Sequence, residues 1–273
     1  MKVLVLGGGV IGVSCAYFLA KAGHEVIVLE RQEGVALETS FGNAGEVSPG
    51  YAAPWSSPGM VIKAIKWLMM EHRPLVLWPK PDPLLWAWVF KLLGNCNEVS
   101  YERNKGRMLR LAEYSRDCLR ELRADTGISY DERAQGTLQM FRSQKQVDAA
   151  GADMAVLERF GVPHTMFDRD GCIGKEPALG HVRHKVVGGL WLPGDETGDC
   201  FKFTRSLAAL AVGLGVEFRF GTCIKAVVPE GARVLGVDTD SGLISADACL
   251  VAMGSYSPQL LKPLGIDLPI YPV

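Results

Sequence analysis

The stretch that decides the fold runs Val3-Leu-Val-Leu-Gly-Gly-Gly-Val-Ile-Gly12 and continues after one helical segment with Glu25-Val-Ile-Val-Leu-Glu30. Its first four residues are valine and leucine, which predicts a buried strand, and Gly7, Gly9 and Gly12 then follow with G-x-G-x-x-G spacing. The next apolar residues recur at helical spacing, and a second strand ends the stretch. This order predicts a strand-helix-strand unit with a parallel sheet.

The residue types of this unit are those that a dinucleotide requires. Gly7 permits a tight turn, Gly9 lets the backbone approach a pyrophosphate, and Gly12 lets helix and strand pack closely. The N–H groups at the helix start would face the phosphates. Glu30 stands where a carboxylate can accept hydrogen bonds from ribose hydroxyls, and its charge would repel the 2′-phosphate of NADP. NAD and FAD both remain open at this point. The predicted contacts are Gly7, Gly8, Gly9, Val10, Ile11, Gly12 and Glu30.

The composition is that of a globular protein, and it excludes several function classes. Of the 273 residues, 48% are hydrophobic and 22% charged, and the formal net charge of −1 gives no electrostatic basis for binding nucleic acid. The seven cysteines are dispersed without a C-x-x-C pair, which indicates reduced thiols in the cytoplasm. His181 and His184 have no cysteine or acidic cluster beside them, so we expect no metal site. No apolar run approaches the ~20 residues needed to cross a bilayer.

Five of the six tryptophans fall between residues 51 and 94, among several prolines. Ser57-Pro58 predicts the start of a helix to about Met70, and Leu84 to Leu93 predicts a second, short apolar helix. Packing of these helices onto the body of the protein explains the pattern. Peripheral attachment to a membrane also remains open, because tryptophan and lysine on apolar helices suit a membrane interface.

The rest of the chain divides into an inserted region and a return to the first domain. Tyr101 to Ala124 predicts an amphipathic helix, and further short elements follow. Strands expected between residues 224 and 246 form a meander, and Asp247 to Gly254 predicts a buried strand that completes the first sheet. We therefore expect a discontinuous nucleotide-binding domain over 1–55 and 195–273, and an inserted domain over 56–194.

Longer segments show a resemblance to a known family. They are the glycine fingerprint ending at Glu30, Thr39-Ser-Phe-Gly-Asn-Ala-Gly-Glu-Val-Ser-Pro-Gly-Tyr51, Ala64-Ile-Lys-Trp-Leu68, Leu192-Pro-Gly-Asp-Glu-Thr-Gly-Asp-Cys200 and Val251-Ala-Met-Gly-Ser-Tyr-Ser257. Together they resemble the flavoprotein amine and D-amino acid oxidase superfamily, and within it the family of bacterial D-amino acid dehydrogenase small subunits. The resemblance implies an α/β fold, α+β overall: a Rossmann-like FAD-binding domain with a β-meander crossover, and an inserted mixed α/β substrate domain.

The resemblance also implies the cofactor and more of its contacts. FAD would place its ADP half on the glycine turn and Glu30. No second glycine fingerprint follows residue 12, so we expect the organic substrate, and not NAD(P)H, to reduce the flavin. The further contacts that the family implies are Arg31, Thr39, Ser40, Asn43, Ala44, Gly45, the backbone of Val227, Ala252 and Gly254.

The implied reaction is oxidative deamination of a D-amino acid such as D-alanine to a 2-oxo acid and ammonia, with electrons passed to a quinone-type acceptor. A cytoplasmic enzyme, with peripheral contact on the inner face of the cell membrane left open, would fit this chemistry. Three alternatives remain: an oxygen-using oxidase of glycine, sarcosine or a related amine, a non-catalytic FAD-binding subunit that works with a second chain, and an NAD-binding dehydrogenase.

One departure from the family concerns the end of the chain. The sequence stops at Val273, where the family continues with the rest of its substrate domain, including the arginine that captures the substrate carboxylate. No catalytic residue is assigned for this reason. We expect this chain alone to bind FAD weakly or to turn over poorly.

Overall fold

The computed structural model describes residues 1–60, 62, 64, 66, 81–231 and 233–271. They form two compact units. Unit 1 comprises Met1–Gly45, Gly127–Asp131 and Asp199–Val273, and unit 2 comprises Glu46–Thr126 and Glu132–Gly198. The boundaries that the sequence suggests, after residue 55 and before residue 195, stay a prediction beside this division.

Unit 1 is built on a four-stranded parallel sheet of the order β12-β1-β2-β8. Its strands are β1 (Lys2–Leu6), β2 (Glu25–Leu29), β8 (Glu217–Arg219) and β12 (Ala248–Val251). Leu6 of β1 lies opposite Val251 on one side and Leu29 on the other, so the first and last segments of the chain share the sheet. This topology confirms the predicted α/β fold class and the returning strand.

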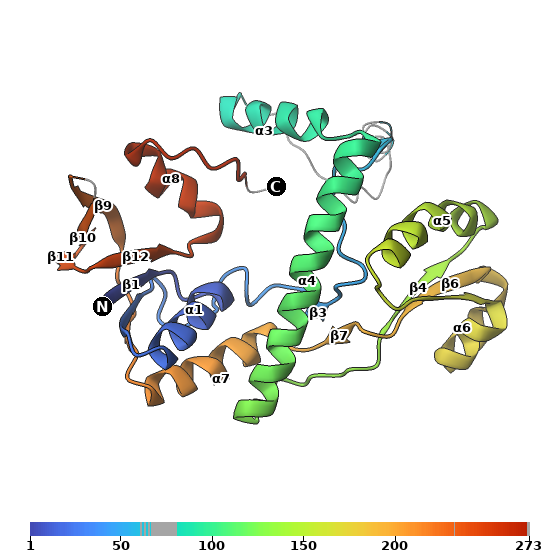
Figure 1. The fold of residues 1–273 in the computed structure, drawn as a ribbon, viewed down its shortest axis with the longest axis horizontal. Helices are drawn as coiled ribbons and strands as arrows, with labels where there is room; N and C mark the ends of the chain where they lie inside the picture. Colours follow the sequence, from blue (N-terminus) through green and yellow to red (C-terminus); the bar gives the residue numbers. More distant parts are fainter. Residues whose placement is uncertain (61, 63, 65, 67–80, 232, 272–273) are drawn as a thin grey trace. The chain divides into compact units, whose positions relative to one another are not determined.

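The two faces of this sheet are covered by different elements. Helix α1 (Val10–Lys21) packs beside α7 (Cys200–Gly213), as Figure 1 shows, and Gly12 of α1 lies against Val5 of β1. On the opposite face, Leu4 and Leu6 pack against Val227 and Leu260. Burial of each such side chain contributes about 1.5–3 kcal/mol before the entropy of ordering is subtracted. Alternating residues of β1 therefore bind the strand to both layers.

The covering layer is the predicted meander, an antiparallel sheet of the order β11-β10-β9. It consists of β9 (Ile224–Glu230), β10 (Arg233–Thr239) and β11 (Gly242–Ser245). After β12, unit 1 ends with η2 (Gly254–Tyr256), α8 (Ser257–Leu261) and η3 (Lys262–Leu264).

Unit 2 combines long helices with a three-stranded antiparallel sheet of the order β4-β6-β5. Leu109, Leu157 and Leu190 belong to the buried core that joins its helices to this sheet. A Cβ atom on Gly106 would lie 2.3 Å from the ring of Phe160, so a larger residue would displace this ring where helix α4 approaches the end of α5. The elements are β3 (Glu46–Val47), α3 (Pro83–Gly94), α4 (Glu98–Thr126), β4 (Thr137–Phe141), α5 (Gln144–Arg159), β5 (Thr165–Asp168), α6 (Arg169–Lys175), η1 (Pro177–Lys185), β6 (Gly188–Leu192) and β7 (Glu196–Thr197).

The helices that the sequence predicts in this region have different outcomes. The amphipathic helix expected from Tyr101 is confirmed as α4, which begins at Glu98, and the short apolar helix is confirmed as α3. Asp82 caps α3 by accepting a hydrogen bond from the N–H of Leu84. The helix expected from Ser57 to about Met70 lies partly outside the described residues.

Candidate functional site

The glycine turn between β1 and α1 accepts no larger residue at two positions. Gly7 has a φ of +110°, and a Cβ atom there would lie 2.6 Å from the carbonyl oxygen of Ala252. A Cβ atom on Gly12 would lie 1.9 Å from the carbonyl oxygen of Gly7. Real Cβ contacts are not this short, so both residues must be glycine for the strand and the helix to meet as they do. The roles predicted for Gly7 and Gly12 therefore have a steric cause in this fold.

The start of α1 is shaped to receive an anion. Gly9 is its N-cap and supplies no side-chain cap, and the first turn contains no acidic residue. The N–H of Val10 donates to Ser40 Oγ at 3.0 Å, which brings the loop after β2 against the helix start. The N-terminus of a helix combines free N–H groups with the positive end of the helix dipole. The structure thus brings Gly9, Val10 and Ser40 together, and their contact with a cofactor stays a prediction.

Glu30, directly after β2, holds its carboxylate at the same turn. Its Oε2 accepts a hydrogen bond from the N–H of Gly8 at 2.6 Å, and its Oε1 accepts one from the N–H of Gln32 at 2.9 Å. A carboxylate can accept about four hydrogen bonds, so acceptor capacity remains for two sugar hydroxyls. The two backbone hydrogen bonds thereby fix the carboxylate in place and leave it able to accept further hydrogen bonds.

Arg31 forms a cluster beside this carboxylate. Its guanidinium lies 4.1 Å from the centre of the Tyr256 ring, and its Nη2 lies 2.5 Å from Glu38 Oε1. Tyr256 and Glu38 together raise the pKa of Arg31. Partial burial alone would raise the pKa of Glu38, but hydrogen bonds from Gln32 and Arg31 outweigh it and lower the pKa of this carboxyl. The sequence analysis did not single out Tyr256 or Glu38, although Tyr256 lies within one of the family-like segments.

The loop that carries the other predicted contacts holds its own shape. The side chain of Asn43 donates to the carbonyl of Ser40 at 2.6 Å and accepts from the N–H of Gly45 at 2.7 Å. Gly45 has a φ of +65°, which favours glycine. Thr39, Asn43 and Ala44 are exposed, so they remain accessible to a ligand.

The contacts predicted near the end of the chain lie in two places. Ala252 donates its N–H to the carbonyl of Leu6 at 2.8 Å, which puts it next to the glycine turn, and Gly254 follows with a φ of +52°. Val227 lies in β9 opposite Val237 and is buried in the core. The contact of each of these residues with a cofactor stays a prediction.

The comparisons with known proteins agree with this geometry. The family model described as FAD dependent oxidoreductase matches residues 2–273. The chain belongs to this FAD dependent oxidoreductase family. It is similar to the D-amino acid dehydrogenase of Methylobacterium radiotolerans, with 61% identity over 274 residues, and to that of Bradyrhizobium diazoefficiens, with 59% identity over 273 residues. Each alignment covers 100% of this chain and 65% of the relative, so the chain spans 65% of the length of these relatives.

Several solved structures share the fold. Glycine oxidase from Bacillus cereus superposes with a TM-score of 0.68 at 23% identity, over 96% of this chain and 57% of the other. The FAD-bound L-α-glycerophosphate oxidase from Mycoplasma pneumoniae superposes with a TM-score of 0.60 at 19% identity, over 96% of this chain and 56% of the other. At these identities the likeness supports the α/β fold alone.

FAD is the cofactor of this oxidoreductase family, and the residues of unit 1 fit it. The turn carries no side chains at residues 7, 8 and 9, and the first turn of α1 contains no acidic residue that would repel a pyrophosphate. The Glu30 carboxylate suits ribose hydroxyls. The family thus answers the choice between NAD and FAD that the glycine turn alone leaves open.

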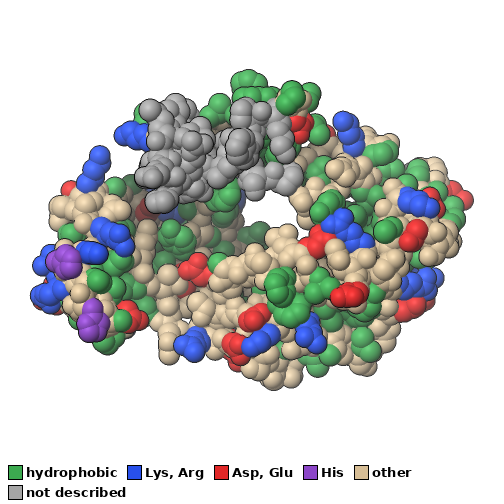
Figure 2. Space-filling view, turned by 180° about the vertical axis from the view of Figure 1, so that it is seen from behind, with side chains coloured by type: hydrophobic (Ala, Val, Ile, Leu, Met, Phe, Trp, Pro, Cys, Tyr) green, Lys and Arg blue, Asp and Glu red, His purple; other side chains and the backbone are tan. Residues whose placement is uncertain are grey.

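Other kinds of site find no support in the described part of the chain. Those residues contain no cluster of three or more histidine, cysteine or acidic side chains that could hold a metal ion. None of their helices is both long enough and apolar enough to cross a membrane. On the face in Figure 2, Lys and Arg side chains are interspersed with Asp and Glu, in keeping with the net charge of −1.

Proposed function

We propose that the chain forms the FAD-binding part of an enzyme that oxidatively deaminates D-amino acids of the D-alanine class. The products would be a 2-oxo acid and ammonia. The observation that carries the proposal is the identity of 59–61% to D-amino acid dehydrogenases over the whole of this chain. The glycine turn, Glu30 and the Ser40 loop support it, because their geometry suits the pyrophosphate and ribose of FAD.

In this reaction FAD, when bound, would accept the two electrons that leave the substrate Cα–H bond, and water would release ammonia from the resulting imino acid. The residues of this chain would hold the cofactor still. Glu30 would bind the ribose hydroxyls, the α1 N-terminus would bind the pyrophosphate, and the loop Thr39–Gly45 would close over the pyrophosphate and flavin. Such positioning matters because transfer from the substrate requires correct distance and orientation more than an acid–base pair.

We propose further that the electrons pass to a quinone-type acceptor at a membrane, with α3 as the membrane-facing element. Of its large apolar side chains, Leu84, Trp86 and Phe90 are exposed by 60%, 47% and 69%, and the buried residue of the helix is Leu85. A helix with such a surface can lie in a membrane interface without spanning it. Attachment would place the protein on the cytoplasmic, inner face of the membrane.

Co-sedimentation with anionic liposomes tests this attachment. We expect Trp86→Ala and Phe90→Ala to reduce the bound fraction several-fold, since each removes apolar area from α3. The matched control is Leu243→Ala, because Leu243 is 50% exposed on β11 of unit 1. Equal binding by all four proteins would count against a membrane role for α3.

The reaction itself is tested by mixing the FAD-loaded chain with D-alanine without oxygen. We expect slow loss of the oxidised-flavin absorption with D-alanine, little with L-alanine and none with NADH. Reoxidation by a quinone analogue, without hydrogen peroxide, would support the dehydrogenase. Rapid reduction by NADH would contradict the proposal, and peroxide production on admission of oxygen would favour the amine oxidase instead.

A further inference from the structure

Unit 2 contains three buried side-chain oxygens that have no hydrogen-bond partner in the part of the chain that the structure describes. They are Ser48 Oγ, Glu113 Oε1 and Asp195 Oδ2. Asp195 is only 1% exposed, and its other oxygen accepts a hydrogen bond from the N–H of Gly50 at 3.1 Å. Buried polar atoms are rarely left unpaired, because the loss of water is then uncompensated. The three oxygens therefore have unused hydrogen-bonding capacity.

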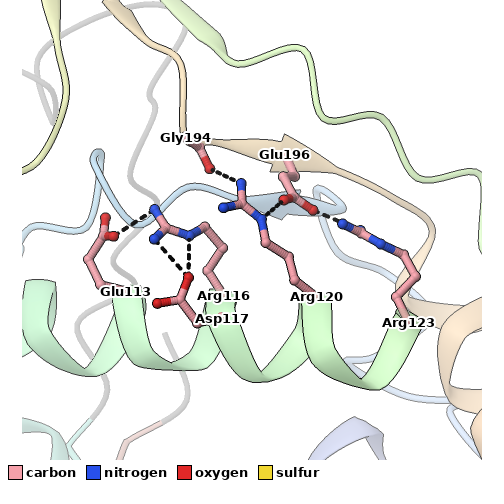
Figure 3. Close-up of polar contacts among 7 residues, drawn as sticks. All are labelled: Glu113, Arg116, Asp117, Arg120, Arg123, Gly194 and Glu196. Carbon is pink, nitrogen blue, oxygen red and sulfur yellow. Dashed lines mark hydrogen bonds and ion pairs between the residues drawn. The ribbon is translucent and has the colours of Figure 1, made fainter. Parts of the chain in front are cut away.

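The charges around Asp195 are negative. The hydroxyl of Ser48 lies beside it, and the carboxylates of Glu46 from β3 and Glu113 from α4 act on it electrostatically. Arg116 on α4 does not neutralise Asp195, because it forms ion pairs with Glu113 and Asp117, as Figure 3 shows. Across the described residues, no lysine or arginine forms an ion pair with Asp195.

The next residue along the chain has the opposite environment. Glu196, also 1% exposed, receives Arg120 Nε at 2.5 Å and Arg123 Nη1 at 2.8 Å, as Figure 3 shows. Arg120 and Arg123 of α4 thus pair with Glu196, and Arg116, which lies beside Gly194, pairs with Glu113 and Asp117, so none of the three forms an ion pair with Asp195. A buried carboxylate without a cation is strongly disfavoured in its ionised form.

We propose that Asp195 is the proton-binding residue of a pH-sensitive clasp within unit 2, comprising Ser48, Gly50, Glu113 and Asp195. In the protonated state, the Asp195 carboxyl donates a hydrogen bond to one of the unpaired oxygens of Ser48 and Glu113, while its carbonyl oxygen holds the Gly50 N–H. In the ionised state, this donor is lost and the charge is repelled by Glu46 and Glu113.

The pKa supports this geometry. Burial raises the pKa of Asp195 to about 6, the hydrogen bond from the Gly50 N–H opposes the rise, and the carboxylates of Glu46 and Glu113 add to it. A pKa raised by folding means that the stabilisation is complete below the unfolded value of 3.8 and is lost as the pH rises through about 6. The clasp would therefore be closed in mildly acidic solution and open at alkaline pH.

The clasp fastens a defined piece of chain. Gly50 packs closely against this turn, because a Cβ atom there would lie 3.0 Å from Leu192 and 3.3 Å from Asp195 Oδ1. Asp195 directly precedes β7, which pairs with β3 in antiparallel register. Its proton thus fixes the segment after β3 to the turn before β7, whether or not the chain binds FAD.

The test is the pH dependence of unfolding by denaturant for the 273-residue chain and its Asp195→Asn variant. An asparagine keeps the acceptor for Gly50, donates an N–H in place of the carboxyl proton and cannot ionise. Ionisation of Asp195 should raise the unfolding equilibrium constant of the unaltered chain about tenfold from about pH 5 to about pH 8. The Asp195→Asn variant should not show this increase. Asp117→Asn, whose carboxylate is exposed, is the control that keeps it.

Two further measurements guard against a variant that merely misfolds. The infrared carbonyl band of a protonated carboxylic acid should be present at about pH 5 and vanish in Asp195→Asn, and Glu113→Gln should move the transition to lower pH by removing a nearby charge. An Asp195→Asn protein that is less stable than the unaltered chain at about pH 8, an unchanged pH profile, or a missing acid band would each overturn the proposal.

Discussion

The carboxylate of Glu30 lies 2.6 Å from the backbone nitrogen of Gly8, which precedes it by 22 positions in the chain. This contact joins the end of β2 to the turn between β1 and α1. It places the acid that suits the ribose and the backbone that suits the pyrophosphate in one structure. The residues predicted to contact the ADP half of FAD thus lie together within unit 1.

Replacement of Gly12 by alanine should disrupt this turn. Its Cβ would lie 1.9 Å from the Gly7 carbonyl oxygen, so α1 must move away from β1. We expect a loss of about 1–3 kcal/mol in the free energy of unfolding, measured by denaturant titration, and loss of FAD binding. Gly213→Ala is the matched control, because a Cβ there meets no atom within 4 Å. Equal stability of the two variants would refute the steric argument.

Glu30→Gln should weaken FAD binding while leaving the fold intact. The amide keeps one acceptor but loses the charge, so the hydrogen bonds to Gly8, Gln32 and the ribose cannot all be retained. Loss of one charged hydrogen bond of about 1.5–3 kcal/mol corresponds to at least tenfold weaker binding, measured by flavin fluorescence. Glu217→Gln, which removes an ion pair with Arg219 in the same unit, should bind FAD as the unaltered chain does. Tight binding by the Glu30 variant would remove Glu30 from the cofactor site.

Glu196→Gln should destabilise unit 2. The buried carboxylate receives both Arg120 and Arg123, and the amide can accept from only one of them well. Both arginines are partly exposed and can regain water, so we expect a loss of about 2 kcal/mol in the free energy of unfolding. Glu158→Gln on the exposed surface of α5 is the control and should change little.

The ion pairs of Glu196 with Arg120 and Arg123 give a pH dependence of stability opposite to that of Asp195. Burial alone would raise the pKa of Glu196, but hydrogen bonds from Arg123 and Arg120 lower this pKa below its usual 4.5. A lowered folded pKa means that the stabilisation is present above that usual value and is lost as the pH falls through the folded one. Acid unfolding of Glu196→Gln should therefore lack this component. An unchanged acid limb in the variant would contradict the assignment.

The sequence predicts unit 1 well because its signals are local. The β1 turn, Glu30 and the strand at Val251 each follow from short patterns in the sequence. Strand β5 was not anticipated, because a four-residue strand is stabilised by pairing with β6 and not by its own pattern.

Contacts between distant segments were beyond the sequence for the same reason. Glu196 and Arg120 are separated by 76 positions, and no spacing rule relates a strand residue to a helix residue so far away. Tyr256 could have been suspected, because it stands in a family-like segment, but its stacking on Arg31 depends on the return of β12 beside β1. Local patterns predicted the cofactor turn, and the tertiary fold determined its neighbours.

The measurement that tests the central claim most directly is a fluorescence titration of FAD with the 273-residue chain, in the presence and absence of ADP. The glycine turn and Glu30 predict weak but saturable binding of one FAD per chain, and ADP should compete because it occupies the same half of the site. A titration without saturation, or binding of FAD that ADP does not displace, would contradict the assignment of unit 1 as the FAD anchor.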